Sequence, residues 1–218
     1  MSDLLLVRHG ETAWSATGRH TGLTDVPLTA RGVEEAISLA PFFRDGQPAL
    51  VLTSPLSRAV ATARLAGLTD GVPDPDLHEW DYGGYEGITT AEIQRTVPHW
   101  SLWTDGVPPG DAHHPGESAA QVGARADRVL ARAATALGED RGDVVLVAHG
   151  HFLRVLTARY LGLPPEDGRL FLLRTGTVSV LSTEHGLPVV AGWNTRPCTA
   201  APRFPGRARP PRAAGPGA

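Results

Sequence analysis

Short apolar runs of strand length recur along the chain, and polar residues follow each of them. Residues 3–7, 49–54 and 143–149 are the clearest of these runs, with little alternation between apolar and polar positions. A continuous apolar run is typical of a strand that is covered on both faces, as in a parallel sheet. We therefore predict three buried strands in these ranges.

Segments with apolar residues every three or four positions separate these runs and predict amphipathic helices. Thr29 is a candidate N-cap for the first of them. Pro55 stands where the second begins, and proline fits the first position of a helix because its missing N–H is not needed there. The predicted helices are, in chain order, 29–43, 55–66, 89–96, 118–137 and 152–161.

The pattern changes toward the C-terminus. Residues 169–193 alternate between apolar and polar positions, which predicts two or three strands with "EHGL" as a hairpin turn. Residues 74–87 read as a short extended piece followed by a glycine-rich loop. Because strands otherwise alternate with helices, we predict an α/β fold, a three-layer α/β/α sandwich with a mostly parallel central sheet.

Composition narrows the candidate chemistry. The chain has 218 residues, the length of one ordinary α/β domain, and its formal net charge is -3. Its 20 basic residues are all arginine, which excludes a lysine Schiff base and a P-loop lysine. Cys198 is the single cysteine, so neither an internal disulfide nor a multi-cysteine metal site is expected.

Charge and hydropathy also bear on partners and location. Basic residues do not cluster on one predicted helix, so nucleic acid is not an expected partner. No apolar run approaches the roughly 20 residues of a membrane span, and "LLLV" is too short for a signal peptide. We expect a cytoplasmic protein with a catalytic domain over residues 1–196. Residues 197–218 are rich in Pro, Arg and Ala, which predicts a disordered tail.

Polar side chains follow the three predicted buried strands at the point where each strand ends. Because the carboxyl ends of parallel strands meet at one edge of a sheet, we expect these side chains to converge on one pocket. Glu79 follows another extended piece and is expected at the rim of this pocket. The converging residues are Arg8 and His9, Ser54 and Arg58, and His149, Gly150 and His151.

These residue types suit phosphoryl transfer. Arginine side chains offer paired N–H donors that match phosphate oxygens. A histidine among arginines stays neutral near pH 7, because its cationic form is disfavoured, and a neutral imidazole is a nucleophile. Its attack on phosphorus would give a phosphohistidine, and a carboxyl group would then protonate the leaving alcohol and activate water. This scheme requires no metal and no cofactor.

Six motifs resemble those of the histidine phosphatase superfamily, the phosphoglycerate mutase-like group. They are "LVRHGET", "TGLTDVPLTARG", "SPLSRAVATA", "EWDYGGYEG", "PGES" and "VAHGH". Their order and spacing match the family over essentially residues 3–195. Within the family the chain looks most like actinobacterial acid phosphatases that are often labelled as mutases, which share "GRHTG" and "HGHF" with it.

The resemblance implies a role for each matching residue. His9 would be the phosphorylated nucleophile, and Glu79 would be the general acid and base. The residues of the phosphate pocket would be Arg8, Arg58 and His149. The candidates for contact with the substrate are Ser15, Thr21, Gly22, Tyr82, Gly150 and His151.

Departures from the mutases favour hydrolysis. Mutases of this family carry a lysine and an arginine pair between the glutamate motif and the long helix, which hold the substrate carboxylate and a second phosphate. Here residues 88–118 contain Arg95 and no lysine, and Ser15 stands where mutases usually have asparagine. Little would retain a bisphosphorylated intermediate, so we predict a phosphomonoesterase for small-molecule phosphate esters.

Several alternatives stay open. A 2,3-bisphosphoglycerate-dependent phosphoglycerate mutase or a sugar bisphosphatase is the alternative activity, and a catalytically inactive anion-binding module is the alternative class. Glu11 and Glu86 are rivals of Glu79 as the acid, and His151 has the alternative of a plain helix-start residue. An edge strand near the C-terminus leaves a homodimer open.

Overall fold

A six-stranded mixed sheet forms the centre of the molecule in the computed structural model, which describes residues 2–44, 46–138 and 142–196. The strand order is β3-β2-β4-β1-β5-β6. Neighbouring strands are parallel from β3 to β1, whereas β5 and β6 are antiparallel to their neighbours. The strands are β1 (Leu4–Arg8), β2 (Leu50–Thr53), β3 (Val72–Pro73), β4 (Val144–Ala148), β5 (Thr177–Glu184) and β6 (Leu187–Thr195).

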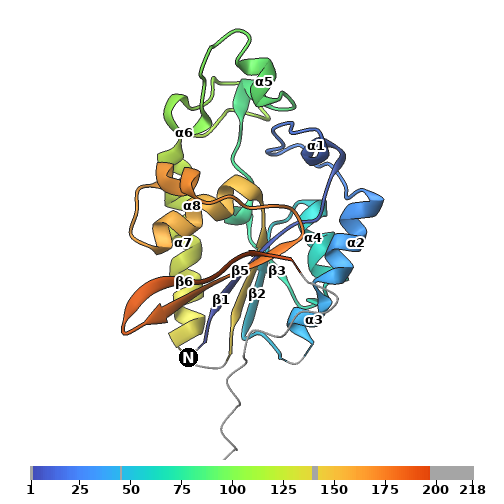
Figure 1. The fold of residues 1–218 in the computed structure, drawn as a ribbon, viewed down its shortest axis with the longest axis vertical. Helices are drawn as coiled ribbons and strands as arrows, with labels where there is room; N and C mark the ends of the chain where they lie inside the picture. Colours follow the sequence, from blue (N-terminus) through green and yellow to red (C-terminus); the bar gives the residue numbers. More distant parts are fainter. Residues whose placement is uncertain (1, 45, 139–141, 197–218) are drawn as a thin grey trace, which may run out of the picture.

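Helices cover both faces of this sheet, which confirms the predicted three-layer α/β/α class (Figure 1). The α-helices are α1 (Ala13–Ala16), α2 (Ala30–Ser38), α3 (Ala40–Phe43), α4 (Ser57–Leu65), α5 (Thr90–Ile93), α6 (Leu102–Asp105), α7 (Ala119–Gly138) and α8 (Gly150–Tyr160). The 3₁₀ helices are η1 (Pro75–Leu77), η2 (Gly83–Tyr85) and η3 (Pro165–Leu170). Within the described ranges, no helix is long and apolar enough to cross a membrane.

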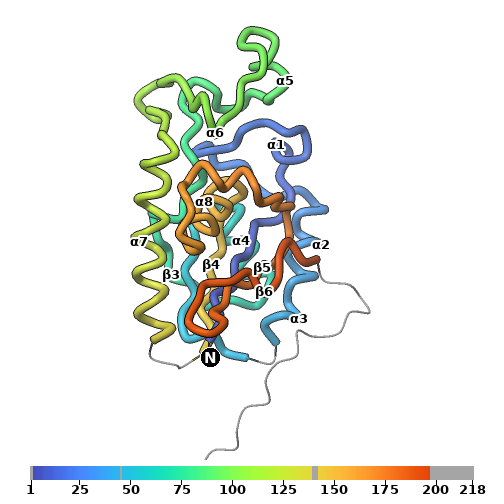
Figure 2. Tube along the Cα trace, turned by 60° about the vertical axis from the view of Figure 1, so that its left-hand side comes forward, coloured from blue at the N-terminus to red at the C-terminus, as the bar shows by residue number. Residues whose placement is uncertain are grey.

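The alternation of side chains along β4 divides the core into two clusters. Val144 and Leu146 pack with α7 and α8 on one face, whereas Val145 and Val147 pack with α3, α4 and Leu39, the C-cap of α2, on the other. Figure 2 shows α7 on one side of the sheet and α2 and α3 on the opposite side. Because both faces of the strand are buried, its sequence is apolar at every position, as the pattern predicted.

Several element boundaries differ from the predicted ones. The helix predicted over 29–43 is two helices, and Pro41, which has no N–H to donate, lies in the first turn of α3. Pro55 precedes helix α4, whose N-cap is Leu56, instead of occupying the first helical position. Helix α8 begins at Gly150, two residues earlier than predicted. The short elements β3, α1, α6 and η3 were not predicted, because two to six residues carry too little periodicity.

The carboxyl ends of β1, β2 and β4 lie at the same edge of the sheet. Arg8 pairs with Ala148, and Thr53 pairs with Val147, so the residues that follow these strands are neighbours. The segment between β3 and α7 rises over this edge with α5 and α6, at the top of Figure 1, opposite the loop that carries α1. The predicted tail, residues 197–218, lies outside the described residues.

Candidate active site

His9 follows β1 directly, and its imidazole ring is oriented by its own backbone neighbourhood. Its side chain is 4% exposed. Nδ1 lies 2.7 Å from the carbonyl oxygen of Gly10. A carbonyl oxygen accepts hydrogen bonds only, so Nδ1 carries the hydrogen of the neutral ring and Nε2 carries the free lone pair. The ring lines a cavity of about 190 Å³, and its Nε2 atom is therefore the candidate nucleophile.

Burial and two arginine side chains keep this ring neutral. Burial is the largest cause of the lowered pKa of His9, followed by the positive charges of Arg58 and Arg8. The pKa lies well below the ordinary value of a histidine. The imidazole is thus unprotonated at Nε2 at neutral pH, which is the form that attacks phosphorus.

Arg8 lines the same cavity and has a hydrogen-bond donor that is not used within the described residues. Its Nη1 atom donates to the carbonyl oxygen of Leu173, whereas its buried Nε atom has no partner among the described residues. Burial lowers the pKa of Arg8. A Cβ atom on Gly150 would lie 3.0 Å from Cζ of Arg8, so a glycine leaves room for the guanidinium group. A buried N–H without an acceptor fits the binding of an anion here.

The guanidinium group of Arg58 is fully buried and donates hydrogen bonds to the loop of residues 21–24. Nη1 donates to the carbonyl oxygen of Thr24 at 2.9 Å, and Nη2 donates to those of Gly22 at 2.8 Å and Thr21 at 3.2 Å. Its Nε atom donates to Nδ1 of His149 at 3.2 Å. Arg58 is not among the residues that line the cavity. In this structure it therefore contributes charge and holds the 21–24 loop.

His149 connects the ends of β2 and β4 and packs next to His9. Its Nδ1 accepts from Arg58, so the neutral ring carries its hydrogen on Nε2, which lies 2.7 Å from Oγ of Ser54. Its ring centroid lies 5.0 Å from that of His9. Burial, then Arg58, holds the pKa of His149 well below its ordinary value. His149 thus packs against His9 as a neutral ring.

The carboxylate of Glu79 lies at the N-terminus of α8. Oε1 accepts from the backbone N–H groups of Trp80 at 2.9 Å and Phe152 at 2.8 Å. Oε2 accepts from the backbone N–H of His151 at 3.0 Å. The side chain lines the cavity and Glu79 is only 5% exposed. Unbonded N–H groups of a first helical turn are natural partners of a carboxylate, and they give this one a single orientation.

The candidate substrate residues occupy different positions around the cavity. Ser15, Thr21, Tyr82 and His151 line it, whereas Gly22 and Gly150 do not. Oγ of Ser15 is also engaged in the cap of α1, since it accepts from the backbone N–H of Thr12.

Close contacts surround Gly22 and join Tyr82 to His151. A Cβ atom on Gly22 would lie 2.7 Å from both an Oε atom of Glu86 and the carbonyl oxygen of Trp80, so a side chain there has no room. The hydroxyl of Tyr82 lies 2.6 Å from Nδ1 of His151. Burial raises the pKa of Tyr82 well above its ordinary value, so the hydroxyl keeps its hydrogen and shares one hydrogen bond with this ring nitrogen.

Four lining residues were not predicted from the sequence, namely Gly18, Arg19, His20 and Thr90. Arg19 and His20 stand in the motif "GRHTG", so that motif was the available signal. Nη1 of Arg19 donates to the carbonyl oxygen of Gly87 at 2.9 Å. Glu11 and Glu86, the rivals of Glu79, do not line this cavity. The described part of the chain contains no group of three or more His, Cys, Asp or Glu side chains placed to hold a metal ion.

A family model described as the histidine phosphatase superfamily (branch 1) matches residues 4–196. The chain belongs to the histidine phosphatase superfamily. An acid phosphatase of Mycobacterium tuberculosis is 42% identical to this histidine phosphatase over 190 residues, which cover 86% of this chain and 90% of that protein. A sedoheptulose 1,7-bisphosphatase of Saccharomyces cerevisiae is 36% identical over 189 residues, covering 73% and 67% of the two chains.

Solved structures agree with this assignment of the histidine phosphatase. The structure of an open reading frame product from Mycobacterium tuberculosis superimposes with a TM-score of 0.82 at 40% sequence identity. The match covers 90% of this chain and 99% of that one. The resemblance seen in the motifs is therefore confirmed at the level of family and fold.

Proposed function

We propose that this histidine phosphatase hydrolyses small-molecule phosphate monoesters through a phosphohistidine on His9. The observation that carries the proposal is the orientation of the imidazole: Gly10 holds Nδ1–H, Nε2 keeps its lone pair, and Arg8, whose Nε has no partner among the described residues, lines the same cavity. A neutral nucleophile next to an anion-binding donor is what attack on a phosphate ester requires.

In the first step, Nε2 of His9 attacks phosphorus, and the bond between phosphorus and the alcohol oxygen breaks. That oxygen takes a proton from Glu79. Two oxygens of a carboxylate offer about four lone-pair positions, and Oε1 already accepts two backbone hydrogen bonds while Oε2 accepts one. The open position on Oε2 is therefore where the catalytic proton would sit.

In the second step, the ionised carboxylate of Glu79 takes a proton from water, whose oxygen attacks the phosphohistidine. The bond between Nε2 of His9 and phosphorus breaks, and inorganic phosphate leaves. The guanidinium groups of Arg8 and Arg58 offset the charge that develops on the phosphoryl oxygens in both steps. A direct contact of Arg58 and His149 with phosphate stays a prediction, because neither lines the cavity.

Water is the proposed acceptor in preference to a second phosphate ester. Between residues 88 and 118, the cavity is lined only by Thr90 among the described residues, and Arg95 is absent from its lining. The cation-poor segment therefore offers no charged side chain to retain a bisphosphorylated intermediate, as a mutase must.

Partners and location are proposed on narrower grounds. We propose that the enzyme is cytoplasmic. We also propose that it binds no nucleic acid, since its formal net charge is -3. We also propose that residues 1–196 form the catalytic domain. A homodimer would pair β6, which lies at the edge of the sheet.

Release of inorganic phosphate from p-nitrophenyl phosphate in the presence of EDTA tests the activity. Wild type is expected to turn over and to form an acid-labile phosphoenzyme, and His9→Ala is expected to lose both. His113→Ala is the matched control, because His113 is an exposed histidine away from the cavity. An active His9→Ala enzyme, or a wild type that needs a metal, would overturn the proposal.

A further inference from the structure

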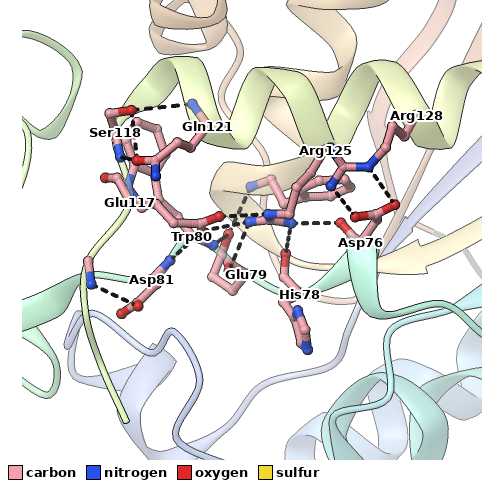
Figure 3. A network of polar contacts seen from close by, with 12 residues as sticks. Asp76, His78, Glu79, Trp80, Asp81, Glu117, Ser118, Gln121, Arg125 and Arg128 are labelled. Carbon is pink, nitrogen blue, oxygen red and sulfur yellow. Dashed lines mark hydrogen bonds and ion pairs between the residues drawn. The ribbon is translucent and has the colours of Figure 1, made fainter. Parts of the chain in front are cut away.

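The segment that carries Glu79 lies between η1 and η2 and has no regular secondary structure of its own. Glu79 itself therefore belongs to no α-helix or strand, although its carboxylate is bound by α8. Figure 3 shows that the segment runs alongside α7, and that Arg125 and Glu117 are the side chains that meet it. Polar contacts to these two side chains replace the hydrogen bonds that regular secondary structure would supply.

Arg125 uses its whole guanidinium group on this segment and on Glu117. Nη1 donates to the carbonyl oxygens of Asp76 at 2.6 Å and His78 at 3.2 Å, and Nη2 donates to that of Glu79 at 3.3 Å. Nε and Nη2 also donate to the two carboxylate oxygens of Glu117 at 2.7 and 2.8 Å. A guanidinium group has five N–H donors, and these contacts occupy all five.

Glu117 holds the segment on the other side of Glu79. Its carboxylate accepts from the backbone N–H of Asp81 at 3.0 Å, and its carbonyl oxygen accepts from Nε1 of Trp80 at 2.8 Å. Its own backbone N–H donates to the carbonyl oxygen of Asp81 at 3.0 Å. The backbone on both sides of Glu79 is therefore tied to one ion pair.

The same guanidinium group also contacts the helix that binds the carboxylate. Cζ of Arg125 lies 5.0 Å from the ring centroid of Phe152, and the backbone N–H of Phe152 donates to Oε1 of Glu79. Arg125 thus touches the segment that carries Glu79 and the first turn of α8, the two structures whose relative position determines where Oε2 points.

We propose that Arg125 and Glu117 are positioning residues for proton transfer by Glu79. They hold the carboxylate against α8, and they do not contact the cavity in which phosphate binds. The inference rests on the proposed function of Glu79 as general acid. Loss of either side chain should therefore impair departure of a leaving group that needs a proton, more than departure of one that does not.

Two substrate esters distinguish a leaving group that needs a proton from one that does not. The p-nitrophenolate ion leaves without much help from an acid, whereas the alkoxide of glycerol 2-phosphate needs a proton. We compare kcat/KM for both esters in Arg125→Gln and Glu117→Gln, because kcat/KM reports the steps up to loss of the alcohol. General acid catalysis is worth about 10²- to 10⁴-fold. Mispositioning should cost about 10- to 100-fold with glycerol 2-phosphate and about threefold or less with p-nitrophenyl phosphate.

Arg128→Gln is the matched control. Arg128 lies one turn further along α7 and pairs with the side chain of Asp76, but it is 54% exposed and holds none of residues 78–81. Its removal should leave the ratio of the two kcat/KM values at that of wild type. Arg125→Lys keeps the charge with fewer donors, and its ratio should lie between those of wild type and Arg125→Gln.

The outcomes discriminate between this inference and the proposed function. An equal loss on both esters in Arg125→Gln and Glu117→Gln, or no loss, would overturn the positioning role. Should Arg125→Gln fail to fold, the ratio in Glu117→Gln decides. Glu79→Gln is measured in parallel: if it changes the ratio while the two positioning variants do not, the inference alone fails. If Glu79→Gln leaves the ratio unchanged, the proposed acid is wrong.

Discussion

The imidazole rings of His9 and His149 meet edge to face, with their centroids 5.0 Å apart and their planes at 61°. Each ring has a lowered pKa, for which burial is the largest cause and Arg58 the second. Both rings therefore stay neutral into the acidic range, in which a carboxyl group can also carry a proton. Burial and the charge of Arg58 therefore keep both imidazole rings in the neutral form that nucleophilic attack requires.

The activity is expected to be highest below pH 7. Glu79 has to be protonated when the alcohol leaves, and the lowered pKa of His9 keeps Nε2 available for attack in the same range. The kcat/KM for glycerol 2-phosphate, measured from about pH 4 to about pH 9, checks this. A maximum well above pH 8 would show that Glu79 is not the acid.

Stability should decrease as the pH falls below about 6.5. His9, His149 and His151 have pKa values well below the ordinary value when folded, so the unfolded chain binds more protons there. Each contributes a slope of about 1.4 kcal/mol per pH unit until its folded pKa is reached, and none above the unfolded pKa.

Denaturant unfolding at a series of pH values measures this dependence. His151→Gln should reduce the slope below about pH 6.5. An unchanged slope in His151→Gln would show that this ring is not held neutral by burial.

Gly150→Ala should weaken binding of the phosphate group. The added Cβ atom would lie 3.0 Å from Cζ of Arg8, so the guanidinium group must shift by a few tenths of an ångström from its present position. We expect a loss of about tenfold in kcat/KM for p-nitrophenyl phosphate, with weaker inhibition by inorganic phosphate. Gly138→Ala is the control, because a Cβ atom there would meet no atom of the described residues within 4 Å. Equal kinetics in both variants would contradict the proposed role of Arg8.

Tyr82→Phe should affect the alcohol portion of the substrate more than its phosphate. The hydroxyl that lies 2.6 Å from Nδ1 of His151 is lost, so the His151 ring is free to reorient or to take the other tautomer. We expect KM for glycerol 2-phosphate to rise about threefold to tenfold, with inhibition by inorganic phosphate unchanged. Parallel changes in both constants would place Tyr82 at the phosphate instead.

The buried strands and the order of the motifs could be predicted because both are local. Residues 144–148 are apolar at every position since alternate side chains enter the two clusters of the core. Pro41 lies at the break between α2 and α3. The helical periodicity of residues 29–43 nevertheless predicted a single helix there. Strand β3 has two residues, both exposed, and no local pattern marks it.

The supports of the site could not be predicted, because they join residues that are far apart in the chain. Ser54 and His149 were predicted to approach the same pocket, but no local pattern indicated that the hydroxyl of Ser54 would lie 2.7 Å from Nε2 of His149, 95 positions away. Arg125 lies on a predicted amphipathic helix, where an arginine is ordinarily a solvated residue. Its five donors turn inward only because α7 packs beside the segment that carries Glu79.

By itself the sequence determined the fold class, the family and the residues that end the three buried strands, since apolar patterning and motif order are properties of the chain. Only the tertiary structure decided which donors stay free for a substrate. It left Nε of Arg8 without a partner among the described residues, whereas the guanidinium group of Arg58 bonds to the 21–24 loop and His149. Two arginines that look equivalent in the sequence differ because their acceptors come from distant segments, which only folding brings within hydrogen-bonding distance.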